Sequence, residues 1–316
     1  MSAMIEVRDL SKQYGGFAAL SGVSFQVAAG EIVGFLGPNG AGKTTTMKIL
    51  TGFLSPSGGE ARVAGFDVVS DSLEVRRRIG YLPESAPIYA EMRVVDYLDF
   101  IGRVRGMAQA ERVTAIERAS HECDIVDRLH QPVGTLSKGY RQRVGIADAL
   151  VAEPEVVLLD EPTIGLDPHQ VLGIRDLLRR LRGKLAVLIS SHILSEVEQV
   201  CDRVVIIHRG RLVAQGRPDD LRRELLPPPA LLVGTPAGAE AVGAVARRLD
   251  SGARASEDGP GRVRVELPRG SAARDRLLGE LAAAGVPVAS LAEEPAGLEA
   301  VFLAATRREA REAPPA

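Results

Sequence analysis

The sequence predicts an α/β fold for about the first 226 residues, followed by a smaller α+β domain. Three observations predict this fold. The apolar runs at 31–36, 156–160 and 186–190 lack polar alternation, which is typical of parallel strands buried on both faces. Within about 92–142, apolar residues recur instead at helical spacing, which predicts a helical insertion. After the prolines at 227–229 the pattern changes again, so these residues are the predicted linker.

The first 90 residues are predicted to contain several shorter strands. Ile5-Glu-Val-Arg alternates and predicts an edge strand, and Ser24-Phe-Gln-Val27 predicts another. Further strands are expected at 61–64 and 79–82. Tyr14 lies in a Gly-flanked segment expected to be a loop, where its ring could stack on a purine or simply pack within the loop.

The segment from Gly37 to Thr45 matches the phosphate-binding pattern of Gly, four residues, and Gly-Lys-Ser/Thr. A Gly-rich turn before an ordinary helix would be the alternative. A predicted strand before the segment and a breaker-free stretch from Lys43 to Leu50 after it favour a P-loop. The residues predicted to bind nucleotide phosphates are Gly37, Pro38, Asn39, Gly40, Ala41, Gly42, Lys43, Thr44 and Thr45.

Each residue type in this loop suits phosphate chemistry. Gly40 and Gly42 allow the backbone to wrap an anion so that N–H groups point inward. The following helix N-terminus adds partial positive charge. Lys43 can reach the β- and γ-phosphates, and the Thr44 hydroxyl can ligate Mg²⁺.

Two carboxylates end the apolar strand at 156–160, at the edge where α/β sheets bind ligands. Asp160 is expected to hold the metal, and Glu161 to orient the attacking water or accept its proton. His192 follows the next buried strand at the same edge, although a histidine at a strand end is usually structural. A strand that only exits into a polar turn would be the alternative.

Composition limits the class of protein. The chain has 316 residues, 45% of them hydrophobic and 25% charged, with a net charge of −2, as in soluble globular proteins. Cys123 and Cys201 are expected to be buried thiols in a reducing compartment. No signal peptide and no spanning helix are predicted, so a cytoplasmic location is expected.

Five motifs stand in a fixed order: the P-loop, Leu136-Ser-Lys-Gly-Tyr-Arg141, the carboxylate-ended strand, Gly165-Leu-Asp167 and His192. Over about residues 4–226 they closely resemble the ATP-binding cassette (ABC) ATPases of ABC transporters. The resemblance implies a P-loop NTPase fold with a helical insertion and antiparallel N-terminal strands. It also implies a head-to-tail homodimer in which each ATP lies between the P-loop of one subunit and the signature stretch, 136–141, of the other.

The resemblance implies roles for individual residues. Ser137 and Gly139 would contact the γ-phosphate across the interface, and Asp167 would make the D-loop contact. Ser137 also stands where an N-cap would, before a predicted helix to about Val151.

For the carboxylate edge and the adenine site, the resemblance implies four further roles. Asp160 would be the Walker B carboxylate and Glu161 the catalytic base. His192 would be the switch histidine, and Tyr14 would stack on adenine.

The chain departs from the usual family motifs at three places. Lys138 and Tyr140 replace Gly and Gln of the signature, while its Ser and second Gly are kept. Glu84 stands where a Q-loop Gln is usual, and a carboxylate can still offer an oxygen to Mg²⁺. Ile164 stands where a small hydroxyl residue is common. Three motifs together resemble the gliding-motility-type subgroup of type 2 ABC exporters: Tyr81-Leu-Pro-Glu84, Leu136-Ser-Lys-Gly-Tyr-Arg-Gln-Arg143 and Gly165-Leu-Asp-Pro-His-Gln170.

The resemblance therefore implies an ATPase subunit of a membrane exporter, with ATP and Mg²⁺ as cofactors. Its partner would be an integral membrane permease that holds it at the inner face of the cell membrane, with no nucleic acid involved. The alternative is a soluble ABC ATPase that acts on nucleic acid or ribosomes. A permease-docking surface is expected between Glu84 and Tyr97, around Tyr89 and Met92, unless these residues form core.

The C-terminal segment 230–310 carries no ATP motif and is expected to be regulatory or to support dimerisation. Strands are predicted at 231–233, 262–267 and 286–290. Helices are predicted at 239–249, 272–284 and 298–303, and a frayed tail at 311–316.

Overall fold

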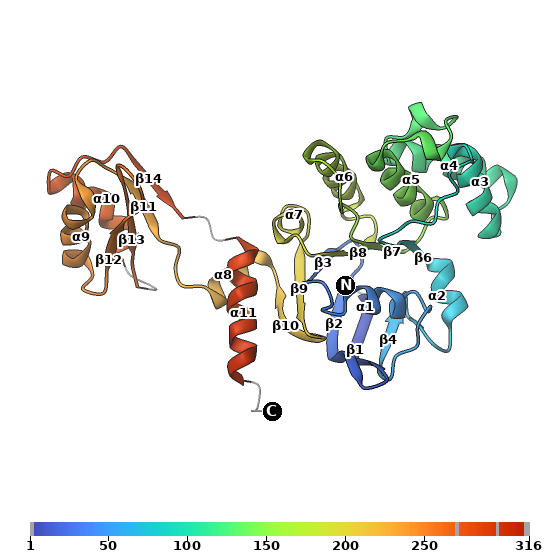
Figure 1. Cartoon of the computed structure of the whole chain (residues 1–316), viewed down its shortest axis with the longest axis horizontal. Helices are drawn as coiled ribbons and strands as arrows, with labels where there is room; N and C mark the ends of the chain where they lie inside the picture. Colours follow the sequence, from blue (N-terminus) through green and yellow to red (C-terminus); the bar gives the residue numbers. More distant parts are fainter. Residues whose placement is uncertain (1–2, 269–271, 295–296, 313–316) are drawn as a thin grey trace. The chain divides into compact units, whose positions relative to one another are not determined.

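The computed structural model describes residues 3–268, 272–294 and 297–312. Its chain divides into two compact units, Met1–Pro218 and Asp219–Ala316 (Figure 1). The division falls after Pro218, the first residue of helix α8 (Pro218–Leu225), whereas the sequence prediction placed the domain boundary after this helix, at 226/227. Residues 313–316 of the predicted tail lie outside the described residues.

A six-stranded sheet organises the first unit, in the order β10-β9-β3-β8-β7-β6. Its five strands from β9 to β6 are parallel, and β10 pairs antiparallel with β9. The strands are β3 (Ile32–Leu36), β6 (Ile79–Leu82), β7 (Val156–Asp160), β8 (Ala186–Ser191), β9 (Arg203–His208) and β10 (Arg211–Gly216). Every residue of β3, β7 and β8 is buried, which confirms the predicted parallel core strands.

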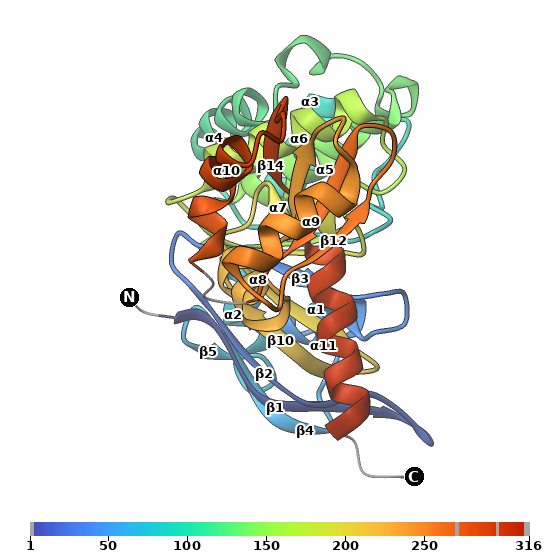
Figure 2. The same ribbon diagram turned by 90° about the vertical axis from the view of Figure 1, so that its left-hand side faces the viewer.

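The N-terminal strands form a second, antiparallel sheet in the order β2-β1-β4-β5. Its strands are β1 (Ala3–Tyr14), β2 (Phe17–Ala28), β4 (Gly58–Val63) and β5 (Phe66–Asp67), and the first three run side by side as a curved ribbon (Figure 2). The prediction of an edge strand at Ile5–Arg8 is wrong, because β1 pairs with β2 on one side and β4 on the other. Tyr14 is the last residue of β1 and does not lie in a loop.

One hydrophobic core joins the two sheets. The rings of Phe25 on β2 and Phe35 on β3 lie 5.2 Å apart between centroids, and Met47 of helix α1 (Lys43–Leu50) is fully buried beside them. On the other face of the six-stranded sheet lie helices α5 (Lys138–Val151), α6 (Pro168–Leu181) and α7 (Leu194–Glu198) (Figure 1). Helix α2 (Ser72–Arg78) precedes β6.

The predicted helical insertion is present. It comprises α3 (Val94–Val104), α4 (Gln109–Glu122), the 3₁₀ turns η1 (Val126–Arg128) and η2 (Val133–Thr135), and α5 (Lys138–Val151). Ser137 caps α5, since its Oγ accepts a hydrogen bond from Tyr140 N at 3.3 Å. Val94 and Tyr97 are buried, so these two positions of the expected docking surface belong to the core.

The second unit contains a four-stranded antiparallel sheet in the order β12-β13-β11-β14. The order along the chain, βαββαβ, is that of a ferredoxin-like domain. The elements are α8 (Pro218–Leu225), β11 (Leu231–Gly234), α9 (Gly238–Leu249), β12 (Arg254–Glu257), β13 (Arg262–Glu266), α10 (Ala273–Ala283), β14 (Ser290–Glu293) and α11 (Leu298–Glu312).

Three details of this unit differ from the sequence prediction. The predicted strand at 286–290 is wrong: β14 begins at Ser290, because Pro287 cannot donate to a ladder and Val286 N bonds back to Leu281 O. Strand β12 was not predicted, and α11 is much longer than the helix predicted at 298–303.

None of the helices among the described residues has the length and apolar character needed to cross a bilayer.

Candidate nucleotide site

The loop between β3 and α1 forms one wall of a cavity of about 470 Å³. Gly40 and Gly42 have φ of +80° and +106°, a region that favours glycine. A Cβ at Gly42 would also lie only 2.8 Å from the carbonyl oxygen of Ala19. The loop residues that line the cavity are Asn39, Gly40, Gly42, Lys43, Thr44 and Thr45, so the N-terminus of α1 opens onto it.

Lys43 is buried and held by oxygens. Its Nζ donates to the carbonyl oxygens of Gly37 at 2.8 Å and Pro38 at 3.4 Å, and lies 3.2 Å from Glu161 Oε1. The carbonyl groups of Gly37 and Pro38 thus hold the Lys43 ammonium. The cavity lining does not include these two residues or the buried Ala41.

Glu161 follows the last residue of β7 and links Lys43 to His192. His192 Nδ1 donates to Glu161 Oε2 at 2.8 Å, so the two carboxylate oxygens have different partners. Glu161 has φ of +52°, which is unusual for a non-glycine residue, and its backbone N–H donates to Ser190 Oγ at 3.0 Å. This bonded, strained turn aims the carboxylate at the cavity.

Asp160 is fully buried at the end of β7. Ser190 Oγ, on the adjacent strand β8, donates to its Oδ1, as expected from the strand register that pairs the two residues. Its other oxygen, Oδ2, is buried and has no hydrogen-bond partner among the described residues. A buried carboxylate oxygen without a partner is costly, so a cation or water is expected there.

Two aromatic side chains line the same cavity from the tip of the β1–β2 hairpin. Tyr14 and Phe17 are directly opposite in the register and are 47% and 64% exposed. Lys12 Nζ lies 5.4 Å from the Tyr14 ring centroid. Exposed rings beside a phosphate loop can offer π-faces to a base.

Comparison with known proteins decides the family. A model described as "ABC transporter" matches residues 20–164. The chain is 37% identical over 221 residues to the uncharacterized ABC transporter ATP-binding protein YxlF of Bacillus subtilis, covering 70% of this chain and 73% of YxlF. The chain belongs to the ABC transporter ATP-binding proteins.

Other relatives agree with this assignment. NatA of B. subtilis is 38% identical over 224 residues, covering 69% of this chain and 91% of NatA. Daunorubicin resistance ATP-binding protein DrrA3 of Streptomyces coeruleorubidus is 37% identical over 221 residues, covering 70% of each chain.

Solved structures share the fold. The structure titled ATP binding subunit of ABC transporter has a TM-score of 0.64 and 34% identity, covering 70% of this chain and 92% of that one. CbiO1 of Clostridium perfringens, titled as part of the ABC transporter complex cbiONQ, has a TM-score of 0.65 and 30% identity, covering 71% and 92%. The predicted P-loop NTPase fold is confirmed, and the protein is an ABC ATPase coupled to transport.

In this ABC ATPase the signature residues stand apart from the P-loop cavity. Ser137 and Gly139 do not line the cavity, and a Cβ at Gly139 would lie 2.6 Å from the Gln170 side chain. Asp167 caps α6, accepting from Gln170 N at 2.9 Å. A single chain therefore brings together the P-loop, Glu161 and Tyr14, but not the signature residues.

Glu84 lines the nucleotide cavity and also a second cavity of about 490 Å³. Ile164 is the other residue that lines both cavities, and Lys138 and Arg141 line the second.

Burial, with the nearby charges of Asp160 and Glu84, raises the pKa of Tyr81 to about 12, so the Tyr81 phenol stays neutral at physiological pH.

Sequence reasoning missed two residues of the ABC ATPase site. Ser190 was treated only as a strand end, although a hydroxyl at the end of the neighbouring parallel strand was a usable signal. Phe17 was not singled out, although two residues, Gly15 and Gly16, separate it from Tyr14 and indicate a hairpin.

Proposed function

We propose that the chain is the ATP-hydrolysing subunit of an exporter and is held at the cytoplasmic face of the membrane by a separate permease. The observation that carries this proposal is the link from Lys43 through Glu161 to His192, in which the buried Lys43 and Glu161 line the P-loop cavity. The names of two relatives support export: Nod factor export ATP-binding protein I of Burkholderia lata and daunorubicin resistance protein DrrA3.

The residues of this link divide the chemistry among them. Lys43 would turn from Glu161 to the β- and γ-phosphates when ATP binds. Glu161, then released on one oxygen, would accept a proton from the attacking water. His192, bonded to its other oxygen, would keep the carboxylate oriented.

The donor set also fits Mg²⁺. Asp160 presents a buried oxygen without a partner, and Thr44 and Glu84 line the adjoining cavity. Hard oxygen donors of this kind suit the ion, which keeps several waters in such sites. When bound, Mg²⁺ supplies positive charge that stabilises the developing negative charge on the phosphates.

Two copies would complete each site. Ser137 and Gly139 do not line the cavity of their own chain, so their proposed contact is with the γ-phosphate bound by a partner, and Asp167 would add the D-loop contact. Tyr14 would stack on adenine. We therefore propose a head-to-tail homodimer that closes on ATP.

The permease would dock beside the Q-loop segment that begins at Glu84. Tyr89 and Phe100 are exposed and stack edge to face, with ring centroids 5.7 Å apart. Exposed aromatic clusters often anchor interfaces. Because Glu84 lines both the nucleotide cavity and the adjacent one, the nucleotide state could be transmitted to this surface.

Glu161→Gln tests the assignment. The variant keeps the shape of the side chain but cannot accept the proton, so ATP hydrolysis should fall roughly 10²–10⁴-fold. Binding should persist, and light scattering should show a dimer at saturating ATP. Lys43→Ala, which loses the phosphate contact, is the control that should stay monomeric. Normal hydrolysis by Glu161→Gln, or a variant that stays monomeric with bound ATP, would contradict the proposal.

A further inference from the structure

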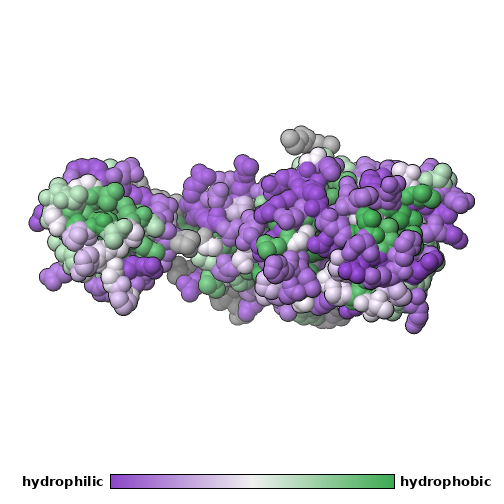
Figure 3. Space-filling view, turned by 90° about the horizontal axis from the view of Figure 1, so that it is seen from above, coloured by the Kyte–Doolittle hydropathy of each residue, from purple (hydrophilic) through white to green (hydrophobic). Residues whose placement is uncertain are grey.

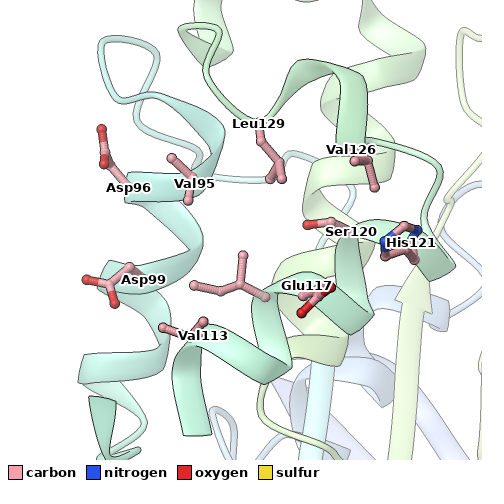
Figure 4. Close-up of a pocket in the computed structure, with 10 residues that line it drawn as sticks. Val95, Asp96, Asp99, Val113, Glu117, Ser120, His121, Val126 and Leu129 are labelled. Carbon is pink, nitrogen blue, oxygen red and sulfur yellow. The ribbon is translucent and has the colours of Figure 1, made fainter. Parts of the chain in front are cut away.

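The helical insertion holds a cavity of about 450 Å³ that is separate from the nucleotide site. It opens between α3, α4 and the segment from η1 to Leu129 (Figure 4). Pockets of this size hold small organic molecules. Its lining residues are Val95, Asp96, Asp99, Val113, Ile116, Glu117, Ser120, His121, Val126 and Leu129, and none of them lines the nucleotide cavity.

Much of this lining is apolar and exposed. Val113 and Val126 are 62% and 44% exposed, and Val95 and Leu129 extend toward the same space (Figure 4). The face in Figure 3 is mostly hydrophilic and shows hydrophobic residues on both units, including the part that carries the helical insertion. An apolar body that covered these valines would be stabilised by removing their surface from water.

Ser120 adds a specific polar group to the apolar cavity. Its side chain is fully buried, yet its Oγ has no hydrogen-bond partner in the described part of the chain. The hydroxyl points toward the centre of the cavity in Figure 4. Buried hydroxyls are nearly always bonded, so this oxygen lacks a partner that a ligand could supply.

The charged groups favour a cation. Three carboxylates line the cavity, with no lysine or arginine among the lining residues. Asp96 is paired with Arg93, and Asp99 with Arg103 and Arg112. Glu117 is exposed and has neither an ion pair nor a side-chain hydrogen bond among the described contacts, so no cationic side chain neutralises its charge.

We propose that this cavity binds a small lipophilic amine. Glu117 and Ser120 are three residues apart on α4 and so lie on the same face of the helix. An ammonium has three donors and can donate to the Glu117 carboxylate and to Ser120 Oγ together. Its apolar body would then cover Val113 and Val126. A carboxylic acid would instead face uncompensated negative charge.

Calorimetric titration of the full-length protein with 3-phenylpropylamine tests the proposal, with 3-phenyl-1-propanol as the uncharged probe of the same shape. The amine should bind several-fold more tightly than the alcohol, because its contact to the exposed Glu117 carboxylate is charge-assisted but screened by solvent. Glu117→Gln should remove that preference. Glu91→Gln, an exposed carboxylate outside the cavity, is the matched control and should keep it.

Ser120→Ala provides a second test, because amine binding in a purely apolar pocket would not depend on the Ser120 hydroxyl. The ligand-free variant should melt no lower than the wild type, because its hydroxyl has no partner to lose. Amine binding should nevertheless weaken several-fold. Equal binding of amine and alcohol, no binding of either, or equal losses in Glu91→Gln and Glu117→Gln would overturn the proposal.

Discussion

The aromatic pair at the tip of the β1–β2 hairpin should contribute to base recognition. Both Tyr14 and Phe17 line the nucleotide cavity. Phe17→Ala should weaken ATP binding about fivefold or more, since stacking of a base on an aromatic ring is worth about 1–3 kcal/mol. Binding of inorganic tripolyphosphate, which has no base, should not change. Fluorescence or calorimetric titrations with the two ligands would measure both effects.

Phe53→Ala is the matched control for this prediction. Phe53 is also exposed, but it does not line the cavity. If Phe17→Ala and Phe53→Ala weaken ATP binding alike, or if tripolyphosphate binding falls with ATP binding, Phe17 has no role at the base.

Functional residues were predictable from the sequence where the motif that identifies them lies within one continuous segment. The P-loop glycines and the Asp160–Glu161 pair follow from a strand and the turn after it. The contact between Lys43 and Glu161 joins two segments far apart in the sequence, and only the parallel pairing of β3, β8 and β7 brings them together. The partner of Asp160 likewise depends on register, which a single sequence does not specify.

At the scale of elements, α3 and α5 are joined by a buried polar contact. Tyr97 Oη donates to Asp148 Oδ2, and burial raises the pKa of Asp148 above its usual value. Because the folded state binds this proton more tightly than the unfolded state, the ionised carboxylate costs stability at neutral pH. That cost is removed as the pH falls from above the folded pKa toward the unfolded value near 3.8.

Asp148→Asn should therefore stabilise the protein at pH 7 by about 1 kcal/mol, because the amide keeps an acceptor for Tyr97 and removes the buried charge. Urea denaturation from pH 8 down to about pH 4 should show this gain shrinking as the pH falls toward the unfolded value.

Asp96→Asn is the control of opposite sign. A hydrogen bond from Arg93 lowers the pKa of this carboxyl, so its ionised form stabilises the fold above the unfolded pKa. That variant should gain nothing at neutral pH. A destabilised Asp148→Asn protein, or a gain that does not depend on pH, would contradict the role assigned to burial.

Element type was easier to predict than element neighbours. The helices of the insertion were predictable because their apolar spacing is strong and Ser137 marks the start of α5. Whether a strand is an edge strand depends on what pairs with it from elsewhere, and β1 has the alternation of an edge strand although β4 covers its second side. The strand predicted at 286–290 was placed on its apolar residues, but Val286 and Val288 pack on the core without joining a ladder.

At the scale of the whole molecule, the exposed rings of Tyr89 and Phe100 should be needed for membrane recovery. Tyr89→Asp places a charge on the proposed permease surface and should abolish co-purification with membranes while leaving basal ATPase activity near normal. The mutated side chain is exposed, so the fold should survive.

Val69→Asp is the control, because Val69 is an apolar residue of similar exposure, 53% against 57% for Tyr89, and lies outside the helical insertion. Membrane recovery of Tyr89→Asp equal to that of Val69→Asp would show that the docking surface lies elsewhere.

Nucleotide binding should belong to the first 226 residues alone. All residues that line the nucleotide cavity lie between Tyr14 and Ile164. A chain that ends after Leu226 should bind ATP with near-wild-type affinity, measured by equilibrium dialysis, and the domain at 230–310 would act in regulation or dimer support. Loss of ATP binding by a truncated chain that is folded by circular dichroism would contradict this division.

The contact between Lys43 and Glu161 has a consequence for how affinities are compared. In the resting protein each charge neutralises the other at 3.2 Å, so an incoming triphosphate must compete with a carboxylate for the ammonium. Breaking the contact between Lys43 and Glu161 therefore lowers the observed affinity of the P-loop for ATP. A glutamine at position 161 removes the competitor, so the slow variant should bind ATP more tightly than the wild type. Dissociation constants measured with Glu161→Gln would consequently overestimate the affinity of the wild-type protein for ATP.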